Sequence, residues 1–151
     1  MSDWITRLDA VRARLDALAT RDFHGLTAAD EKTGEQWESG QVWAHLAEFG
    51  DYWLGELDKV LAGAETFGRT KADPERIAAI ARDRTTDRGA LVARVHASMD
   101  QLRARLVAMT DDDWRTSSRH PTLGDMSIDD QMQHFHVGHY EEHADQLDSL
   151  T

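Results

Sequence analysis

Apolar residues recur at intervals of three and four over most of the chain, and this spacing predicts long amphipathic helices. The first helix is expected over residues 2–20, with Ser2 as a suitable N-cap. Its apolar stripe consists of Trp4, Leu8, Val11, Leu15 and Leu18. The second is expected to start after Ser39 or Gly40 and to run to about Leu61. One face of it carries Val42, His45, Phe49, Trp53, Glu56 and Val60.

Two more long helices are predicted in the second half of the chain. Thr85 or Thr86 can cap the first of them, which runs to about Met109. Its stripe consists of Leu91, Val95, Leu102 and Leu106, with Met99 and Met109 close by. The last helix is expected to start at Ser127, whose spacing to Asp130 resembles a capping box, and to continue to near the C-terminus.

Four long helices in 151 residues predict an all-α protein that folds as one four-helix-bundle domain over residues 1–151. Asp73 followed by Pro74 is typical of a helix start, so a short additional helix is expected from there to about Arg82. Short extra helical turns in the connectors complete the expected fold. Two prolines and ten glycines leave little material for a sheet with many tight turns.

Composition narrows the possible functions. The formal net charge is -11, and the arginines alternate with acidic residues, so nucleic acids and anionic membrane surfaces are not expected partners. No apolar run approaches the roughly 18 residues of a membrane span, and the charged N-terminal segment does not resemble a signal peptide. A cytoplasmic location is therefore expected. The chain has no cysteine, so any thiol used in its chemistry has to arrive on a small molecule.

The segment HFHVGHYEEHADQL, residues 134–147, holds four histidines in ten residues. A wheel at about 100° per residue places His139, His143 and Gln146 at the centre of the apolar stripe of the last helix. The same wheel turns His134 and Tyr140 away or sideways, and it leaves His136 at the edge. His139 and His143 thus stand where aliphatic residues are expected, and burying them is unfavourable unless each finds a partner.

Histidines four residues apart on a helix can converge on one metal ion. That spacing alone is a weak signal, and a lone histidine such as His45 is more often a satisfied core residue than a ligand. If the two helices face each other, however, His45, His139 and His143 form a three-histidine site. Such a site leaves one coordination position open, which is the pattern of catalytic rather than structural metal sites.

Other polar candidates carry less weight. Glu48 and Glu142 each follow a proposed ligand by three residues and could orient it or act as a base, but for both we expect a solvated side chain. Glu56 lies about 16 Å along the helix from His45 and is expected to line another part of a pocket or the end of the bundle. The remaining histidines, none expected to be a ligand, are His24, His96 and His120.

These segments resemble the DinB/YfiT-like superfamily. The similar pieces are VWAHLAEF around His45, HVGHYEEHADQL, and the approach RHPTLGDMSIDDQMQHFHVGH. The resemblance implies a four-helix bundle that binds one divalent metal through His45, His139 and His143, with Gln146 at the position of the family's glutamine. It also implies chemistry with a low-molecular-weight thiol such as bacillithiol or mycothiol, because known members include transferases and isomerases of that kind.

The sequence thus favours a metal-dependent enzyme that acts on a small molecule, with Zn, Ni or Fe as the expected ion. A thiol-dependent transfer or isomerisation is the first hypothesis, with the thiol as cosubstrate. A metal-dependent hydrolase, which would activate water with the same ion, is the second. The third is a non-catalytic bundle that binds metal or acts by association, and a homodimer interface would favour this third hypothesis.

Overall fold

A computed structural model describes residues 2–151, most of which are helical. In chain order the elements are α1 (Ser2–Leu18), α2 (Ser39–Leu61), α3 (Pro74–Asp83), α4 (Arg88–Ala108), α5 (Asp111–Trp114), β1 (Ser117–His120), β2 (Gly124–Ser127), α6 (Ile128–Phe135) and α7 (Val137–Ser149). α1 begins at the residue expected to cap it, and the position before it lies outside the described residues. The short helices α3 and α5 lie in connectors, as predicted.

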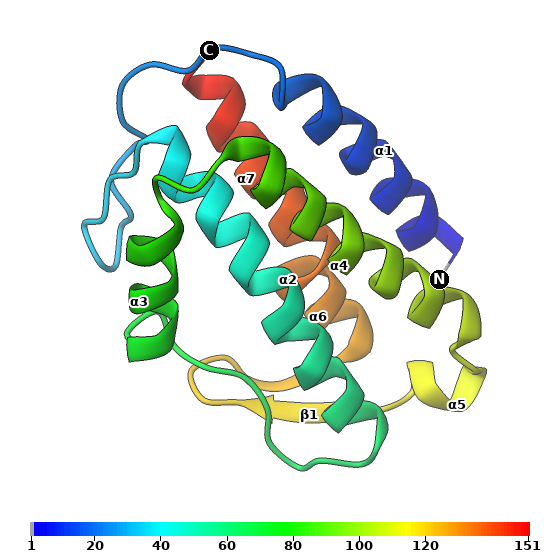
Figure 1. The fold of residues 1–151 in the computed structure, drawn as a ribbon. Helices are drawn as coiled ribbons and strands as arrows, with labels where there is room; N and C mark the ends of the chain where they lie inside the picture. The colour runs from blue at the N-terminus through cyan, green and yellow to red at the C-terminus, as the bar shows by residue number, and fades with distance from the viewer. Residues whose placement is uncertain (1) are drawn as a thin grey trace.

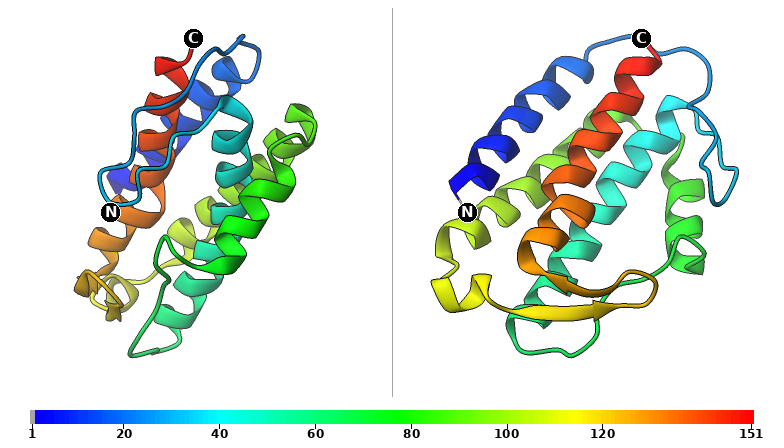
Figure 2. Two further views of the ribbon diagram at one scale, coloured as in Figure 1. Left: turned by 90° about the vertical axis from the view of Figure 1, so that its left-hand side faces the viewer. Right: turned by 180° about the vertical axis from the view of Figure 1, so that it is seen from behind.

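Four helices form the bundle. α1 packs against α4 and α7, and α2 packs against the same two helices, so each long helix has two neighbours (Figure 1). Figure 2 shows α7 lying between α1 and α2 when the molecule is seen from behind. The predicted all-α four-helix bundle is therefore confirmed.

The helices do not simply alternate in direction along the chain. α1 and α7 run one way along the bundle, and α2 and α4 both run the other way (Figure 1). Because α2 and α4 are parallel and follow each other in the chain, the backbone has to return along the bundle between them. Residues 62–87 make this return, and α3 within them packs against α2. We call this segment the crossover.

The predicted apolar stripes form the core. Among the stripe residues Leu8, Val42, Leu91 and Leu102 are at most 2% exposed. Burying one such aliphatic side chain stabilises the fold by about 1.5–3 kcal/mol. None of the helices in residues 2–151 has both the length and the apolar character of a membrane span.

The helix starts follow local hydrogen bonds. The Asp73 carboxylate accepts from the Glu75 and Arg76 amides, with Pro74 in the first turn, and Ser127 and Asp130 form the predicted capping box. The predicted cap of α4 was wrong. Asp87, not Thr85 or Thr86, caps that helix, because its carboxylate accepts from the Ala90 amide at 3.1 Å.

The last helix is not continuous, and this corrects the prediction. It is divided into α6 and α7 at His136, whose backbone angles (φ -122°, ψ -104°) are not helical. At the division the backbone folds tightly, since a Cβ on Gly138 would lie 1.9 Å from the carbonyl oxygen of Gln133. Only glycine permits that approach.

A small antiparallel hairpin, β1–β2, covers one end of the bundle and was not predicted (Figure 2). The hairpin holds the crossover in place. The Phe67 amide donates to the Arg119 carbonyl at 3.0 Å, the Arg119 amide donates to the Glu65 carbonyl at 3.0 Å, and Ser118 Oγ donates to the Ala64 carbonyl at 2.8 Å. Residues 64–67 therefore run beside β1, with a single parallel bridge between Thr66 and Arg119.

Two glycines of α2 offer a matched test of this packing. A Cβ on Gly50 would lie 2.7 Å from Ser98 Cβ and 2.7 Å from Tyr140 Oη, whereas one on Gly55 would meet no atom within 4 Å. We expect Gly50→Ala to lower the free energy of unfolding by about 1–3 kcal/mol through overpacking. Gly55→Ala should raise it by up to about 1 kcal/mol through helix propensity. Urea unfolding measures both, and equal stability of the two variants would contradict the close α2–α4–α7 contact.

Candidate metal centre

Three histidines from two helices meet inside the bundle. His45 comes from α2, and His139 and His143 lie one turn apart on α7. One ring nitrogen of each lies within 4.8 Å of one ring nitrogen of both others. His45 and His143 are buried and His139 is partly exposed. The structure thus brings together the three residues that were predicted to form a site.

Two of the three rings are oriented by a residue three positions later in the same helix. His45 Nδ1 lies 2.9 Å from Glu48 Oε2, and His143 Nδ1 lies 2.6 Å from Gln146 Oε1. Since a carboxylate or amide oxygen can only accept, each Nδ1 carries the proton and each Nε2 keeps its lone pair. That is the tautomer in which a histidine coordinates a metal through Nε2.

Two ring nitrogens of the cluster have no hydrogen-bond partner in the described part of the chain. Within residues 2–151, His143 Nε2 and His139 Nδ1 are buried and have no hydrogen-bond partner. The His139 ring stacks on Phe49 with a centroid distance of 4.1 Å and an interplanar angle of 15°. A buried polar atom without a partner is unfavourable, and a metal cation is a partner that imidazole nitrogens can share. The donor set therefore fits a transition-metal ion.

Burial keeps all three rings neutral. Burial, together with repulsion from His143, holds the pKa of His45 and of His139 well below the ordinary value for histidine. Burial lowers the pKa of His143 to about 4, although the bond to Gln146 acts in the opposite direction. Neutral imidazole is the form that binds metal, so the cluster is ready to coordinate at neutral pH.

Aromatic residues enclose the cluster. Trp37, from the connector between α1 and α2, contacts the His45 ring edge-on at a centroid distance of 5.1 Å and stacks near His143 at 6.2 Å. Its indole also lies 5.5 Å from the guanidinium of the buried Arg76. The contribution of Trp37 was not predicted, because it lies in a connector without periodicity.

Glu48 corrects an expectation. It was predicted to be solvated, but it is buried, and its two oxygens contact Arg69 and His45. Burial raises the pKa of Glu48, and the neighbouring Arg69 acts against this rise. The three-residue spacing from His45 was the available signal, but the partner, Arg69, lies 21 positions further along the chain. Glu142 is exposed, as expected.

The remaining histidines lie outside the cluster. His134 is exposed, as predicted, and His120 lies in β1. His136 was placed at the edge of the stripe, and Tyr140 was expected to point away or sideways, but both are buried. The division at His136 explains the difference, because residues after it no longer follow the wheel set by α6.

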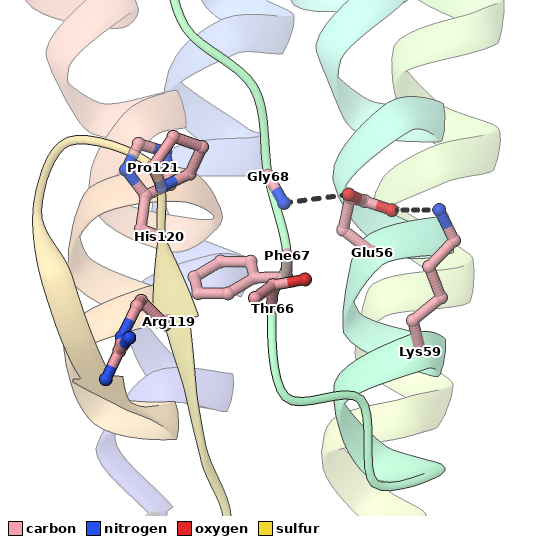
Figure 3. A pocket seen from close by; sticks show the side chains of 8 residues that line it. All are labelled: Glu56, Lys59, Thr66, Phe67, Gly68, Arg119, His120 and Pro121. Carbon is pink, nitrogen blue, oxygen red and sulfur yellow. Dashed lines mark hydrogen bonds and ion pairs between the residues drawn. The ribbon is translucent and has the colours of Figure 1, made fainter.

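A cavity of about 370 Å³ lies far along α2 from the histidine cluster (Figure 3). Glu56 and Lys59 of α2 form one side of it, the crossover from Thr66 to Gly68 passes through the middle, and residues 119–121 form the other side. This agrees with the expectation that Glu56 lines another part of a pocket. Its carboxylate is already bound, since it accepts from the Gly68 amide at 2.8 Å and pairs with Lys59.

Known proteins resemble this chain in sequence and fold. A family model described as the DinB superfamily matches residues 6–147. Among solved structures, YfiT from Bacillus subtilis, described as a probable metal-dependent hydrolase with an unusual four-helix bundle topology, has a TM-score of 0.78 at 19% identity. The match covers 98% of this chain and 83% of YfiT. No curated protein matches the chain at a significant level.

A mycothiol-dependent maleylpyruvate isomerase has a TM-score of 0.74 at 15% identity, over 97% of this chain. A mutant of that isomerase gives 0.68 at 17% identity. This chain spans 60% of the isomerase chain. At these identities the structural likeness demonstrates a common fold.

The burial of His136 can be tested in metal-free protein through the pH dependence of stability. Burial lowers its pKa to about 3. Between there and the unfolded value near 6.5, the unfolded chain binds a proton that the folded chain does not. The free energy of unfolding should therefore fall as pH falls through this window, by up to about 1.4 kcal/mol per pH unit from this group.

We expect His136→Gln to flatten that pH dependence in chelator-treated protein, as measured by urea unfolding between pH 7 and pH 5. His134→Gln, which changes an exposed neighbour, is the control and should keep the wild-type slope. Identical slopes for all three proteins would show that His136 is not buried in its neutral form.

Proposed function

The chain belongs to the DinB superfamily, and on this basis we propose that it is a metal-dependent enzyme acting on a small molecule. His45, His139 and His143 would hold one divalent transition-metal ion. The observation that carries the proposal is the convergence of three ring nitrogens within 4.8 Å, with buried and unpartnered nitrogens on His139 and His143. Three imidazoles would leave one coordination position open for water or substrate.

The chemistry follows from such a site. A divalent ion on three neutral imidazoles lowers the pKa of a bound water or thiol and supplies a nucleophile near neutral pH. Glu48 and Gln146 keep the His45 and His143 rings in the coordinating tautomer. Trp37 and Phe49 cover the rings and limit access of bulk water.

We favour a thiol-dependent transfer or isomerisation. The similar isomerase uses mycothiol, and this chain has no cysteine, so the thiol would be a cosubstrate. A hydrolase is the second candidate. It is favoured by YfiT, which is described as a probable metal-dependent hydrolase and which the chain covers more fully. The ions that three imidazoles suit include Zn, Ni and Fe.

Metal content is the first test. We expect purified protein to bind about one equivalent of Zn²⁺ or Ni²⁺, as measured by elemental analysis after dialysis. At a free metal concentration of 100 times Kd, binding should raise the free energy of unfolding by about 2.7 kcal/mol. His143→Ala should abolish binding, because it removes a ligand. His96→Ala is the control, since His96 lies on the surface beside Asp16 and should leave binding unchanged. Wild-type protein that takes up no metal would refute the proposal.

The reaction class needs a separate test. Metal-loaded protein should convert small electrophiles only when mycothiol, bacillithiol or a simpler thiol is added, as followed by loss of free thiol or by product chromatography. A parallel panel of esters and amides tests hydrolysis without thiol. Turnover of the second panel alone would establish the hydrolase and refute the thiol hypothesis. Turnover of neither panel by metal-loaded protein would favour the non-catalytic bundle.

A further inference from the structure

We propose that Arg69 of the crossover and Glu48 of α2 act as a positioning pair that fixes His45 for metal binding. This inference rests on the proposed metal site and adds Arg69, which binds neither metal nor substrate, to the contact between Glu48 and His45 described above. It assigns a function to the crossover, which the helical pattern of the sequence does not reveal.

The contacts form a continuous chain from the crossover to the cluster. Arg69 Nη2 pairs with Glu48 Oε1, and Glu48 Oε2 lies 2.9 Å from His45 Nδ1. The side chains of these three residues are 8%, 6% and 4% exposed. The guanidinium also lies 4.0 Å from the centroid of the Tyr52 ring, which supports its flat face. Few water molecules can therefore reach this chain of contacts.

The direction of each hydrogen bond determines which nitrogen of His45 is free. Arginine can only donate, so Glu48 Oε1 accepts from Arg69, and the carboxylate charge is balanced inside the protein. The other oxygen then accepts the Nδ1 proton of His45. Nε2 then carries the lone pair, and one ring nitrogen of His45 lies within 4.8 Å of one on each of the other two histidines. A group that donated to Nδ1 would place the proton on Nε2 and prevent coordination.

The backbone beside Arg69 is fixed from two sides. The Gly68 amide donates to Glu56 Oε1 at 2.8 Å, and His120 Nε2 donates to the Arg69 carbonyl at 3.1 Å. Gly68 has a φ of +92°, and a Cβ there would lie 2.6 Å from His120 Cδ2. Glycine is therefore required at this position. These restraints direct the Arg69 side chain toward Glu48.

The test compares metal affinities of variants by competition with a chromophoric chelator for Zn²⁺. Loss of partners that orient a ligand typically weakens binding 10–100-fold, and we expect losses in that range for Arg69→Met and for Glu48→Gln. Arg69 and His45 bind different oxygens of Glu48, and an amide replaces one of these oxygens with an NH2 group that can only donate. Arg69→Lys, which keeps the charge, should recover part of the affinity. Arg103→Met removes an exposed ion pair with Asp9 and is the control with wild-type affinity.

Non-additivity separates positioning from simple stabilisation. If Arg69 acts through Glu48, the double variant Arg69→Met/Glu48→Gln should bind Zn²⁺ no more weakly than the weaker single variant. A merely structural ion pair would lower the thermal midpoint of the metal-free variants but leave their affinity for Zn²⁺ unchanged. That result, or fully additive losses, would overturn the proposal.

The tautomer of His45 can be read without metal. Long-range ¹H–¹⁵N correlation spectra of metal-free wild type should show a protonated Nδ1 and an unprotonated Nε2 for His45, and Arg69→Met should populate the other tautomer. An unchanged tautomer in Arg69→Met would overturn the inference. If wild type binds no metal but shows this tautomer and its dependence on Arg69, the proposed function fails while the positioning of His45 by the pair stands.

Discussion

The arrangement around the three histidines depends on the free-energy cost of burying imidazole rings. Three rings lie against one another inside a helical bundle, where a charged form would be strongly unfavourable and a neutral form still needs partners for its two nitrogens. Two of the six ring nitrogens have partners on their own helices, since Glu48 and Gln146 bind Nδ1 of His45 and of His143. His139 Nδ1 and His143 Nε2 are buried without a partner among the described residues, and a shared cation is a partner that fits them. Trp37 and Phe49 surround these rings with apolar surface. This raises the free-energy cost of a ring nitrogen that has no partner.

The sequence was most informative where the determining interactions are local. The spacing of apolar residues predicted the four long helices. His139 and His143 lie one turn apart, so they share one face of the helix whichever way that face points. The burial of Tyr140 was not predicted because the wheel assumed one continuous helix. The non-helical backbone at His136 changes the direction in which the later side chains point. The hairpin was missed because strands of four residues carry too few alternations to be recognised. The burial of Glu48 and the contribution of Trp37 were not predicted for a different reason. Their partners are distant in sequence, and only the packed fold brings them together.

The parallel course of α2 and α4 has a consequence for the candidate site. A bundle in which neighbouring helices simply alternate needs only short turns, but here the chain has to travel the length of the bundle between α2 and α4. The returning segment passes over the half of α2 that carries His45 and Glu48. It therefore supplies a buried cation, Arg69, beside a buried acid that would otherwise lack a counter-charge. The parallel arrangement of α2 and α4 thus requires the returning segment that places a positive charge beside Glu48.

The double attachment of residues 64–69 also bears on how such a protein could diverge. These residues are joined to the hairpin at both ends, and Gly68 and Arg69 are also joined to Glu56 and Glu48 of α2. An inserted or deleted residue within them would shift Arg69 out of register with its acid, so selection should hold this stretch at constant length. Lineages that acquire new substrates would therefore be expected to keep the length of residues 64–69.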